Sequence, residues 1–264
     1  MAISIIVPVL NEAAQIQATL RSLTAPQSTD LSRNNELEII VVDGGSSDHT
    51  GEIARSLGAR VIGSPPGRAN QMNRGAAVAT KNVLLFLHAD TRLPSNYPTL
   101  VEAALATPTT AAGAFELKID APGRLLRFVE RMVNWRSRLL SLPYGDQALF
   151  LRADVFKDVG GFASLPIMED FELVRRLQQR GRIHIVPAAV LTSARRWQKL
   201  GIIRTTLINQ VTIAGYFLGI PPATLARWYR APQARRTGER GKLLRNGKKV
   251  APQREQGTGE RGFD

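Results

Sequence analysis

Two carboxylates follow apolar segments at positions suited to holding a phosphorylated ligand. Asp43 comes after the apolar run 37–42 and before a turn of small residues, so its oxygens can accept hydrogen bonds from a nucleoside base or ribose. Asp90 ends the sequence His88-Ala89-Asp90 behind the apolar run 83–87. Carboxylate oxygens are the ligands that Mg²⁺ and Mn²⁺ prefer, and these ions share their coordination with substrate phosphates. Asp90 is therefore a candidate metal ligand.

A third acidic site, Glu169-Asp170, opens the amphipathic segment 170–179. One of its carboxylates could serve as a general base that deprotonates a hydroxyl nucleophile. Each of the three sites also has a structural explanation. The strand-end acids suit helix caps and turns, His88 suits a buried histidine, and acids at the start of a helix are favoured by its dipole. Spacing alone does not choose between these explanations.

The elements that must position these residues alternate along the first 110 residues. Strands are predicted over residues 3–9, 37–42, 60–62 and 83–87, with amphipathic helical segments between them. This alternation predicts an α/β fold in which helical crossovers join the strands of an open, mostly parallel twisted sheet. Ligands of such a sheet bind at the carboxyl ends of its strands.

Polar residues follow each of the four predicted strands. They are Asn11 and Glu12, Asp43 and Ser46, Gly67 and Arg68, and His88 and Asp90. Helix caps account for any single position, but four such groups at one edge of the sheet favour a binding site.

The pattern beyond residue 110 is less regular. Strands are predicted over residues 112–119, 149–151 and 183–186, and helices over residues 125–142, 170–179, 202–218 and 222–229. The chain is therefore expected to end in a helical part.

Composition and charge narrow the functional classes. The 264 residues include no cysteine, which excludes disulfides, thiolate-bound zinc, iron–sulfur clusters and a cysteine nucleophile. The sequence has neither the features of a signal peptide nor a run of about 18 apolar residues, so a cytoplasmic location is expected. The net charge of +13 favours acidic partners: phosphorylated substrates, anionic lipid or nucleic acid. Residues 231–264, rich in Lys and Arg and poor in large apolar residues, are expected to form a disordered basic tail.

Five motifs occur in an order that resembles the family 2 glycosyltransferases, which have the GT-A fold and invert the configuration of the transferred sugar. They are Val7-Pro8-Val9-Leu10-Asn11-Glu12, Val41-Val42-Asp43-Gly44-Gly45-Ser46-Ser47-Asp48-His49-Thr50, Gly67-Arg68-Ala69-Asn70-Gln71-Met72-Asn73-Arg74-Gly75, Phe86-Leu87-His88-Ala89-Asp90, and Gly161-Phe162 with Glu169-Asp170. The resemblance implies a GT-A domain over residues 1–230, with a nucleotide-binding half at 1–110 and an acceptor and catalytic half at 111–230. A finer resemblance, to a small bacterial subgroup associated with arsenosugar-type biosynthesis, rests on Leu87-His88-Ala89-Asp90, Tyr144-Gly145-Asp146-Gln147 and Arg195-Arg196-Trp197.

The resemblance also implies a role for each matching position. The nucleotide pocket would be lined by Pro8, Asn11, Glu12, Asp43, Arg68, Asn73 and His88. Asp90 would bind a divalent cation, Mg²⁺ or Mn²⁺, and Asp170 would be the general base with Glu169 beside it. The acceptor side would contain Asp146, Gln147, Arg196 and Trp197. The implied reaction moves one sugar from a nucleotide-sugar, with uridine the commonest base, to an acceptor hydroxyl with inversion.

Three positions depart from the family pattern. Gly44 stands where a second acid often follows Asp43, and His88 stands at the first position of the Asp-x-Asp motif, so one ribose or metal contact is changed. Ser193 stands where the processive synthases have the glutamine of their Gln-x-x-Arg-Trp pattern. The last difference favours transfer of a single sugar over polymerisation.

Two other functions fit parts of the sequence. Nucleotidyltransferases that make nucleotide-sugars also use an α/β sheet and Mg²⁺, but they typically have a glycine-rich basic loop after the first strand, where this chain has Pro8 to Glu12. A non-catalytic binder of nucleic acid or an anionic surface would explain the net charge. The sequence has no zinc-binding spacing and no RNP-type aromatic motif, so no specific nucleic-acid partner is expected.

Two apolar segments, 125–142 and 207–220, are compatible with more than one kind of partner. The first mixes apolar residues (Leu125, Val129, Met132, Val133, Leu139 and Leu140) with basic ones (Arg124, Arg127, Arg131, Arg136 and Arg138). Packing on the core or formation of a homodimer explains both segments. Peripheral contact with an anionic membrane surface also explains them and suits a lipid-linked acceptor, whereas a soluble small-molecule acceptor would need no such contact.

Overall fold

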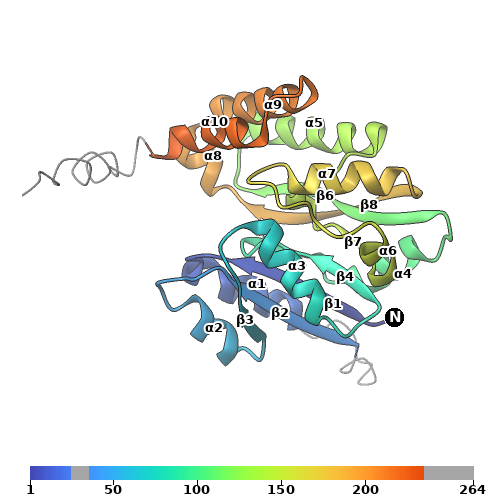
Figure 1. Cartoon of the computed structure of the whole chain (residues 1–264). Coiled ribbons are helices and arrows are strands. Elements are labelled where there is room, and N and C mark those ends of the chain that lie inside the picture. Colours follow the sequence, from blue (N-terminus) through green and yellow to red (C-terminus); the bar gives the residue numbers. More distant parts are fainter. Residues whose placement is uncertain (25–35, 235–264) are drawn as a thin grey trace, which may run out of the picture.

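The computed structural model describes residues 1–24 and 36–234, and an eight-stranded sheet forms its centre. The strand order is β3-β2-β1-β4-β7-β6-β8-β5. The parallel strands are β1 (Ile3–Val9), β2 (Leu37–Asp43), β3 (Arg60–Gly63) and β4 (Val83–Phe86). The other strands are β5 (Thr91–Arg92), β6 (Thr110–Asp120), β7 (Phe150–Arg152) and β8 (Arg182–Ser193). β7 is antiparallel to β4 and β6, β8 is parallel to β6, and β5 is antiparallel to β8. The predicted α/β fold with a mostly parallel sheet is confirmed (Figure 1).

The parallel half forms because its strands are apolar on both faces. Ile3, Ile5 and Val7 of β1 pack with α1 (Ala13–Thr24) and α2 (Thr50–Ser56) on one side of the sheet. Ile6 packs with α3 (Arg68–Val78) on the other side. The close approach of α3 requires Gly75, since a Cβ atom there would lie 2.5 Å from the Cγ2 atom of Ile6. This contact sets the position of the residues at the start of α3.

The strand predicted over residues 183–186 proved too short. β8 extends from Arg182 to Ser193 and pairs with β6 along most of its length. The register shifts where Phe115 pairs with Val186 and Glu116 with Ala189, so Pro187 lies in a bulge of β8. Proline is tolerated at bulges because no ladder hydrogen bond is needed there. Pro187 interrupts the apolar pattern, so local sequence does not reveal that the strand continues beyond it.

Several short elements were not predicted from the sequence. They are β5, α4 (Tyr97–Leu105), α6 (Ala153–Asp158) and α8 (Arg195–Leu200). β5, α6 and α8 are too short to show a clear period. They are stabilised by packing on the sheet and the neighbouring helices, which a local pattern does not reveal.

The remaining helices cover the mixed half of the sheet. α7 (Glu169–Gln178) packs against Ala112 and Ile183, while α5 (Arg124–Leu140) packs on the opposite face against Phe115 and Leu117. α9 (Ile202–Phe217) contacts α5, α8 and α10 (Pro222–Ala234). α5, α8, α9 and α10 form the upper layer in Figure 1, and α7 lies below them beside the sheet. No helix within residues 1–24 and 36–234 is both long and apolar enough to cross a membrane.

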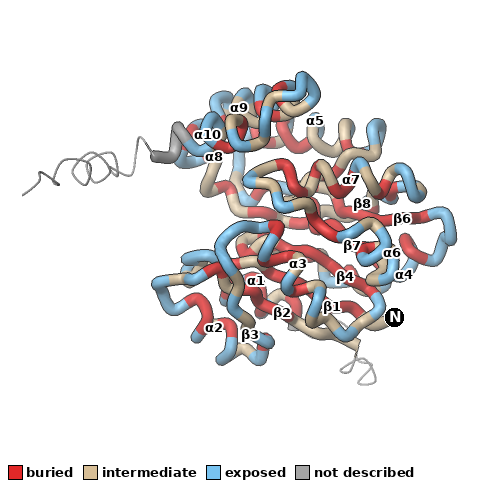
Figure 2. Tube along the Cα trace, viewed as in Figure 1, coloured by how far each residue is buried: buried red, intermediate tan, exposed pale blue. Residues whose placement is uncertain are grey.

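The buried hydrophobic residues form two clusters, one on each side of the sheet, and Figure 2 shows that buried residues are concentrated along the strands. The expected domain end at residue 230 falls within α10, which continues to Ala234. Residues 235–264, the rest of the predicted tail, lie outside the described residues. The division into halves at residues 110 and 111 stays a prediction.

α5 buries only part of its predicted apolar set. Val129 is buried, and Val133 packs against the core. Leu126, beside them on the helix, is also buried. The other predicted members, Leu125, Met132, Leu139 and Leu140, are exposed. Packing on the core therefore accounts for only one side of this helix, and the choice between a homodimer and a membrane surface for its outer side stays open.

Candidate active site

An open cleft begins at the carboxyl ends of β1 and β4 and extends to the start of α7 and to α8, α9 and α10. Its volume is about 1370 Å³, above the roughly 300–1,000 Å³ typical of a pocket for one small ligand. The cleft therefore has room for a nucleotide and a second substrate. Many of the predicted site residues line it: Pro8, Glu12, Arg68, His88, Asp90, Asp146, Glu169, Asp170, Arg196 and Trp197.

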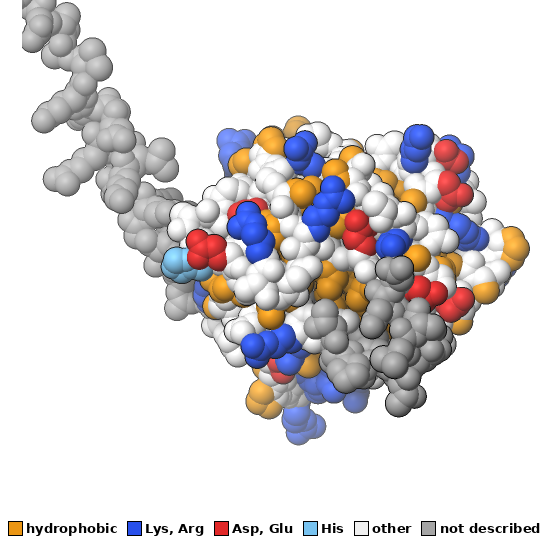
Figure 3. Space-filling model, turned by 90° about the horizontal axis from the view of Figure 1, so that it is seen from below, with side chains coloured by type: hydrophobic (Ala, Val, Ile, Leu, Met, Phe, Trp, Pro, Cys, Tyr) orange, Lys and Arg blue, Asp and Glu red, His pale blue; other side chains and the backbone are white. Residues whose placement is uncertain are grey.

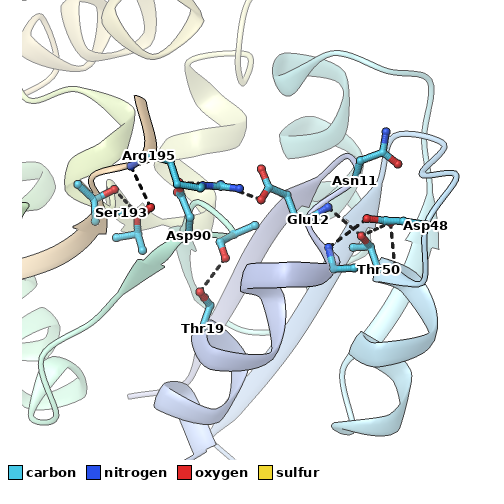
Figure 4. Close-up of polar contacts among 12 residues, drawn as sticks. Asn11, Glu12, Thr19, Asp48, Thr50, Asp90, Ser193 and Arg195 are labelled. Atoms are coloured by element: carbon cyan, nitrogen blue, oxygen red, sulfur yellow. Dashed lines mark hydrogen bonds and ion pairs between the residues drawn. The ribbon is translucent and has the colours of Figure 1, made fainter. Parts of the chain in front are cut away.

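Arg195 connects two carboxylates at the sheet edge of the cleft. Its Nη2 atom donates to Oε2 of Glu12 at 2.8 Å and to Oδ2 of Asp90 at 2.9 Å. Figure 4 shows the guanidinium group between the two acids. Burial raises the pKa of Glu12, and Arg195 partly opposes this. Burial would lower the pKa of Arg195, but its bonds to Asp90 and Glu12 raise it overall. The bridge joins the residues that follow β1 and β4 to the start of α8.

Asp43 and Asn11 organise the turn after β2 and do not line the cleft. The Oδ1 atom of Asp43 accepts hydrogen bonds from the N–H groups of Gly45 and Ser46 and from the Ser46 hydroxyl, at 2.7 to 3.1 Å. The Oδ1 atom of Asn11 accepts one from the N–H group of Ser47 at 2.8 Å. Such side-chain contacts to nearby N–H groups are typical of turns. The nucleotide contacts expected for these two residues stay predictions.

The structure explains the departure at Gly44. A Cβ atom at this position would lie 3.1 Å from Nε2 of Gln71. Gln71 is buried, and its Nε2 atom donates to the carbonyl oxygens of Val9 and Val42, both at 2.8 Å. This amide therefore ties the ends of β1 and β2 to α3. A second acid after Asp43 would require this amide to shift by a few tenths of an ångström.

Arg68, the first residue of α3, brings positive charge to the cleft. Burial would lower its pKa, but the negative charges of Glu169, Asp170 and Asp90 contribute to raising it. Burial, followed by the charge of Arg68, lowers the pKa of His88 to about 4. His88 is therefore neutral at pH 7, and a neutral imidazole offers one ring nitrogen as an acceptor or metal ligand.

The acidic pair opens α7 beside Gly145. The N–H group of Gly145 donates to Oδ2 of Asp170 at 2.5 Å, and that of Phe171 donates to Oδ1 at 2.7 Å. A Cβ atom on Gly145 would lie 2.9 Å from Oδ2 of Asp170 and 3.2 Å from Nε2 of His88, so this close approach requires glycine. Met168, just before the pair, has a φ of 68°. Non-glycine residues in this left-handed conformation are strained, and they recur at functional sites.

Two other carboxyl groups at the cleft are shifted toward neutral pH. Glu169 is 5% exposed, and its pKa rises to about 7 through burial and the charge of Asp170. Burial raises the pKa of Asp146 to about 6, Arg136 opposes the shift, and Asp170 adds to it. Perturbed carboxyl groups in a cleft are typical of sites that bind or exchange protons.

Several buried polar atoms without a hydrogen-bond partner among the described residues lie in the cleft around Asp146, Arg196 and Trp197. They are Oη of Tyr144, Oδ1 of Asp146, Nε and Nη2 of Arg196, Nε1 of Trp197 and Oδ1 of Asn209. The guanidinium of Arg196 also stacks on Tyr229, 3.7 Å from the ring centroid. Because buried polar atoms are normally paired, this set indicates a ligand with several donors and acceptors.

Asn73 and Gln147, two further predicted residues, bond within the protein and do not line the cleft. The Nδ2 atom of Asn73 donates to the carbonyl oxygen of Phe162, and its Oδ1 atom accepts from the N–H group of the same residue, both at 2.8 Å. The Oε1 atom of Gln147 accepts from the Ser137 hydroxyl and the Tyr144 N–H group, while its Nε2 atom donates to a carbonyl of β6. Their substrate contacts stay predictions.

Several cleft residues were absent from the predicted site: Tyr144, Arg195, Asn209 and Tyr229. Three had a visible signal, because Tyr144 and Arg195 belong to the motifs quoted above and Asn209 interrupts an apolar helix. Tyr229 had none, since segments far apart in the chain meet only after folding.

The side chains near Asp90 suit a metal ion that is also coordinated by a bound diphosphate. Residues 1–24 and 36–234 hold no group of three or more histidine or acidic side chains arranged to bind a metal. Asp90 offers a carboxylate and His88 a neutral imidazole, which fits Mg²⁺ or Mn²⁺ that takes its other ligands from a diphosphate. These residues do not suit a metal held by the protein alone.

Comparison with known sequences identifies the family. The sequence model described as Glycosyl transferase family 2 matches residues 4–165, more than half of the chain. The chain belongs to glycosyl transferase family 2. The match includes the strand-end residues of the cleft, and the acidic pair of α7 lies just beyond its end.

Individual family 2 relatives match parts of the chain. The PGL/p-HBAD biosynthesis glycosyltransferase of Mycobacterium tuberculosis is 41% identical over 97 residues, which are 34% of this chain and 36% of that protein. The chain thus matches about a third of that curated relative's length.

Two solved structures share the fold. The mannosyltransferase PcManGT from Pyrobaculum calidifontis, in complex with GDP-Man and Mn²⁺, has a TM-score of 0.61 at 17% identity, covering 93% of this chain and 79% of that one. Glucosyl-3-phosphoglycerate synthase from Mycobacterium tuberculosis, in complex with Mn²⁺, UDP and glucosyl-3-phosphoglycerate, has a TM-score of 0.56 at 22% identity, covering 80% and 79%. The predicted GT-A type of fold is confirmed.

Proposed function

We propose that this family 2 protein is an inverting glycosyltransferase that moves one sugar from a UDP-linked donor to an acceptor hydroxyl. One observation carries the proposal: the same cleft holds Arg68, Asp90 and Arg195 at its sheet edge and the Asp170 carboxylate at the start of α7. A diphosphate near the arginines and a hydroxyl near Asp170 would bring the reacting groups together.

The donor end of the cleft must stabilise the leaving diphosphate. Breaking the bond between sugar and phosphate leaves negative charge on the nucleotide. Arg68 supplies positive charge there, and Arg195 neutralises the charges of Glu12 and Asp90. Pro8 and Glu12 lie beside the expected nucleotide. Asp90 and His88 would hold Mg²⁺ or Mn²⁺, whose charge would help to neutralise the diphosphate when bound. The Mn²⁺ complexes of the two related structures support this choice of cofactor.

Asp170 is the proposed general base. Two N–H groups orient its carboxylate, so one lone pair can face the acceptor hydroxyl. As the hydroxyl oxygen bonds to C1 of the sugar, the C1–O bond to the phosphate breaks on the opposite face, and the hydroxyl proton passes to Asp170. One displacement inverts the configuration at C1. Glu169 adjoins this base and sets the charge around it.

The acceptor side is assigned to the unpartnered polar atoms around Asp146, Arg196 and Trp197. Their mixture of donors and acceptors supports a hydroxyl-rich or otherwise polar acceptor, either a small molecule or the head of a lipid-linked one. The resemblance to the arsenosugar-associated subgroup and the cytoplasmic location both stay predictions.

Calorimetric titration with UDP- and GDP-linked sugars, with and without Mn²⁺, tests the proposal. UDP-linked sugars should bind, and Mn²⁺ should strengthen the binding. Asp90→Ala should remove the effect of Mn²⁺, whereas the control Arg92→Ala, which breaks an exposed ion pair with Asp120, should not. Absence of nucleotide-sugar binding, with turnover of UTP and a sugar phosphate, would instead support a nucleotidyltransferase.

A further inference from the structure

Exposed large apolar side chains concentrate on one layer of helices. Within the described residues, all such side chains except Leu10 lie on α5, α9 and α10 or at Leu218, directly after α9. We call the outer side of these three helices the helical face. Its helices form the upper layer in Figure 1, and their outward sides are exposed in Figure 2.

The apolar residues of the helical face follow helical spacing. On α5 they recur at intervals of three and four residues, at Leu125, Phe128, Met132, Trp135 and Leu139. Phe128 is 58% and Trp135 61% exposed. On α9, Ile203, Leu207 and Val211 are each four residues apart. Such spacing places each set along one side of its helix, so both helices present an apolar stripe to solvent.

The charges on these helices are of one sign. Every exposed charged residue in the described parts of α5, α8, α9 and α10 is Arg or Lys, and residues 195–234 contain no acid. The only acid of α5, Glu130, is buried and paired with Arg127.

Three of the five arginines of α5 make contacts within the protein. Besides the paired Arg127, Arg136 stacks on Tyr144, and Arg138 pairs with Glu116 of β6. Arg124 and Arg131 are exposed and form no ion pair with a described residue, and Arg204 and Arg227 add charge on α9 and α10. The positive character of the helical face therefore comes from several helices.

We propose that the helical face docks on the surface of an anionic lipid bilayer. Apolar stripes with aromatic residues, flanked by basic ones only, are typical of helices that lie in a membrane interface. The face seen from below in Figure 3 differs, because basic and acidic side chains are interspersed there. This proposal stands independently of the proposed reaction, since it concerns a surface outside the cleft.

Charge favours lipid over the other possible occupants of the helical face. A second copy of the chain placed symmetrically on this face would bring basic surfaces together, and like charges destabilise such a contact. The segment 235–264 carries nine Lys or Arg and four Asp or Glu, so it would also meet like charge. Anionic headgroups complement the arginines while the acyl region receives the apolar stripes.

Co-sedimentation of the full chain with vesicles tests the proposal. Binding is expected to vesicles of phosphatidylglycerol mixed equally with phosphatidylcholine, but not to phosphatidylcholine alone, and high salt should weaken it. The double variant Phe128→Ser/Trp135→Ser should bind at least tenfold more weakly, since it removes two large apolar groups from the interface. Arg131→Gln should cost about fivefold. The matched control Arg55→Gln, on α2, should bind as the original protein does.

Three results would overturn the proposal. One is equal vesicle binding by the Phe128→Ser/Trp135→Ser variant. Another is loss of binding only when Lys and Arg within 235–264 are changed, which would assign it to that segment. The third is a dimer in analytical ultracentrifugation that the same double variant dissociates, which would make the helical face an interface between copies. Unchanged UDP affinity in each variant would show that its fold is intact and would separate docking from donor binding.

Discussion

Two backbone N–H groups orient the Asp170 carboxylate. Its neighbours Glu169 and His88 differ from each other in pKa. Asp170 accepts from Gly145 and Phe171 on separate oxygens. Glu169 is buried with a pKa of about 7, and His88 has a pKa of about 4. At neutral pH the site therefore combines an oriented carboxylate, a carboxyl near its midpoint and a neutral imidazole. Such a combination suits proton transfer from a hydroxyl group.

The substitution Asp170→Asn should abolish the base with little effect on donor binding. We expect kcat for sugar transfer to fall by about 10² to 10⁴-fold, the usual contribution of a general base. UDP affinity, measured by calorimetry, should stay close to that of the original protein. Glu172→Gln, in the same helix turn, is the control for charge at the start of α7. Near-normal turnover by Asp170→Asn would move the base to another carboxylate such as Asp146.

The raised pKa of Glu169 should make stability depend on pH. Because the folded state holds the proton more tightly than the unfolded state, this group lowers the free energy of unfolding as pH rises from its ordinary pKa of 4.5 to about 7. Burial is the main cause of the raised pKa, the charge of Asp170 adds to it, and Arg68 and Arg230 oppose it.

Glu169→Gln removes this contribution. Its Tm relative to the original protein should therefore rise between about pH 5 and pH 8, a trend that thermal melts at several pH values can follow. Asp158→Asn, an exposed acid of α6, should show no such trend. A Tm difference for Glu169→Gln that stays constant with pH would mean that Glu169 titrates normally in the folded protein.

Side-chain hydrogen bonds between elements fix the positions of the helices and strands around the cleft. Gln71 ties α3 to the ends of β1 and β2, and Asn73, two residues later, ties the same helix to the loop before α7 through Phe162. Because α3 begins with Arg68, these bonds position a charged group of the cleft. The residues around the cleft are thus held by contacts outside it.

Asn73→Ala should destabilise the protein. It leaves the N–H and C=O groups of Phe162 without their partner, which costs about 1–3 kcal/mol and corresponds to roughly 2–10 °C in Tm for a protein of this size. The control Asn70→Ala, whose amide makes only a 3.5 Å contact with Pro66, should have a smaller effect. Unchanged Tm with weaker UDP binding would instead support the nucleotide contact that the family resemblance implies.

Arg195 joins parts of the molecule that lie far apart in the chain. Glu12 follows β1, Asp90 follows β4, and Arg195 begins α8, so the bridge connects the parallel half of the sheet with the C-terminal helices. These groups are partly exposed, and the bridge should contribute no more than about 1 kcal/mol to stability. Its larger effect is to neutralise two acids that would repel a diphosphate.

Arg195→Ala should make nucleotide binding more dependent on metal. Without the guanidinium, Glu12 and Asp90 repel UDP unless Mn²⁺ compensates, so the ratio of Kd without Mn²⁺ to Kd with Mn²⁺ should increase about tenfold. Asp90→Ala should change the same ratio in the opposite direction, toward one. If the ratio is unaffected by Arg195→Ala, the bridge has no electrostatic role in donor binding.

Local patterns in the sequence were enough to predict the parallel half and much of the site. Apolar runs of strand length and the helical periods between them predicted β1 to β4, and the polar residues at the strand ends were recognisable because parallel strands end at one edge of the sheet. Glu12 and Asp90 were therefore predicted from strand ends, and Asp170 from the start of a helix, and all three line the cleft. The motifs carrying these residues were also sufficient to indicate the family.

Only the tertiary structure decides which polar residues line the cleft, which bond within the protein and which apolar residues are buried. Asn73 and Gln147 are as polar as the residues of the cleft. Their hydrogen-bond partners, Phe162 and Ser137, lie in other elements, so the local sequence does not predict these bonds. Likewise β8 continues past Pro187 because β6 accommodates a bulge. The spacing of Met132 and Leu139 predicts an apolar side of α5 but not whether the fold covers it. Local periodicity depends on neighbours in the chain, whereas burial and pairing depend on which distant segments arrive beside them.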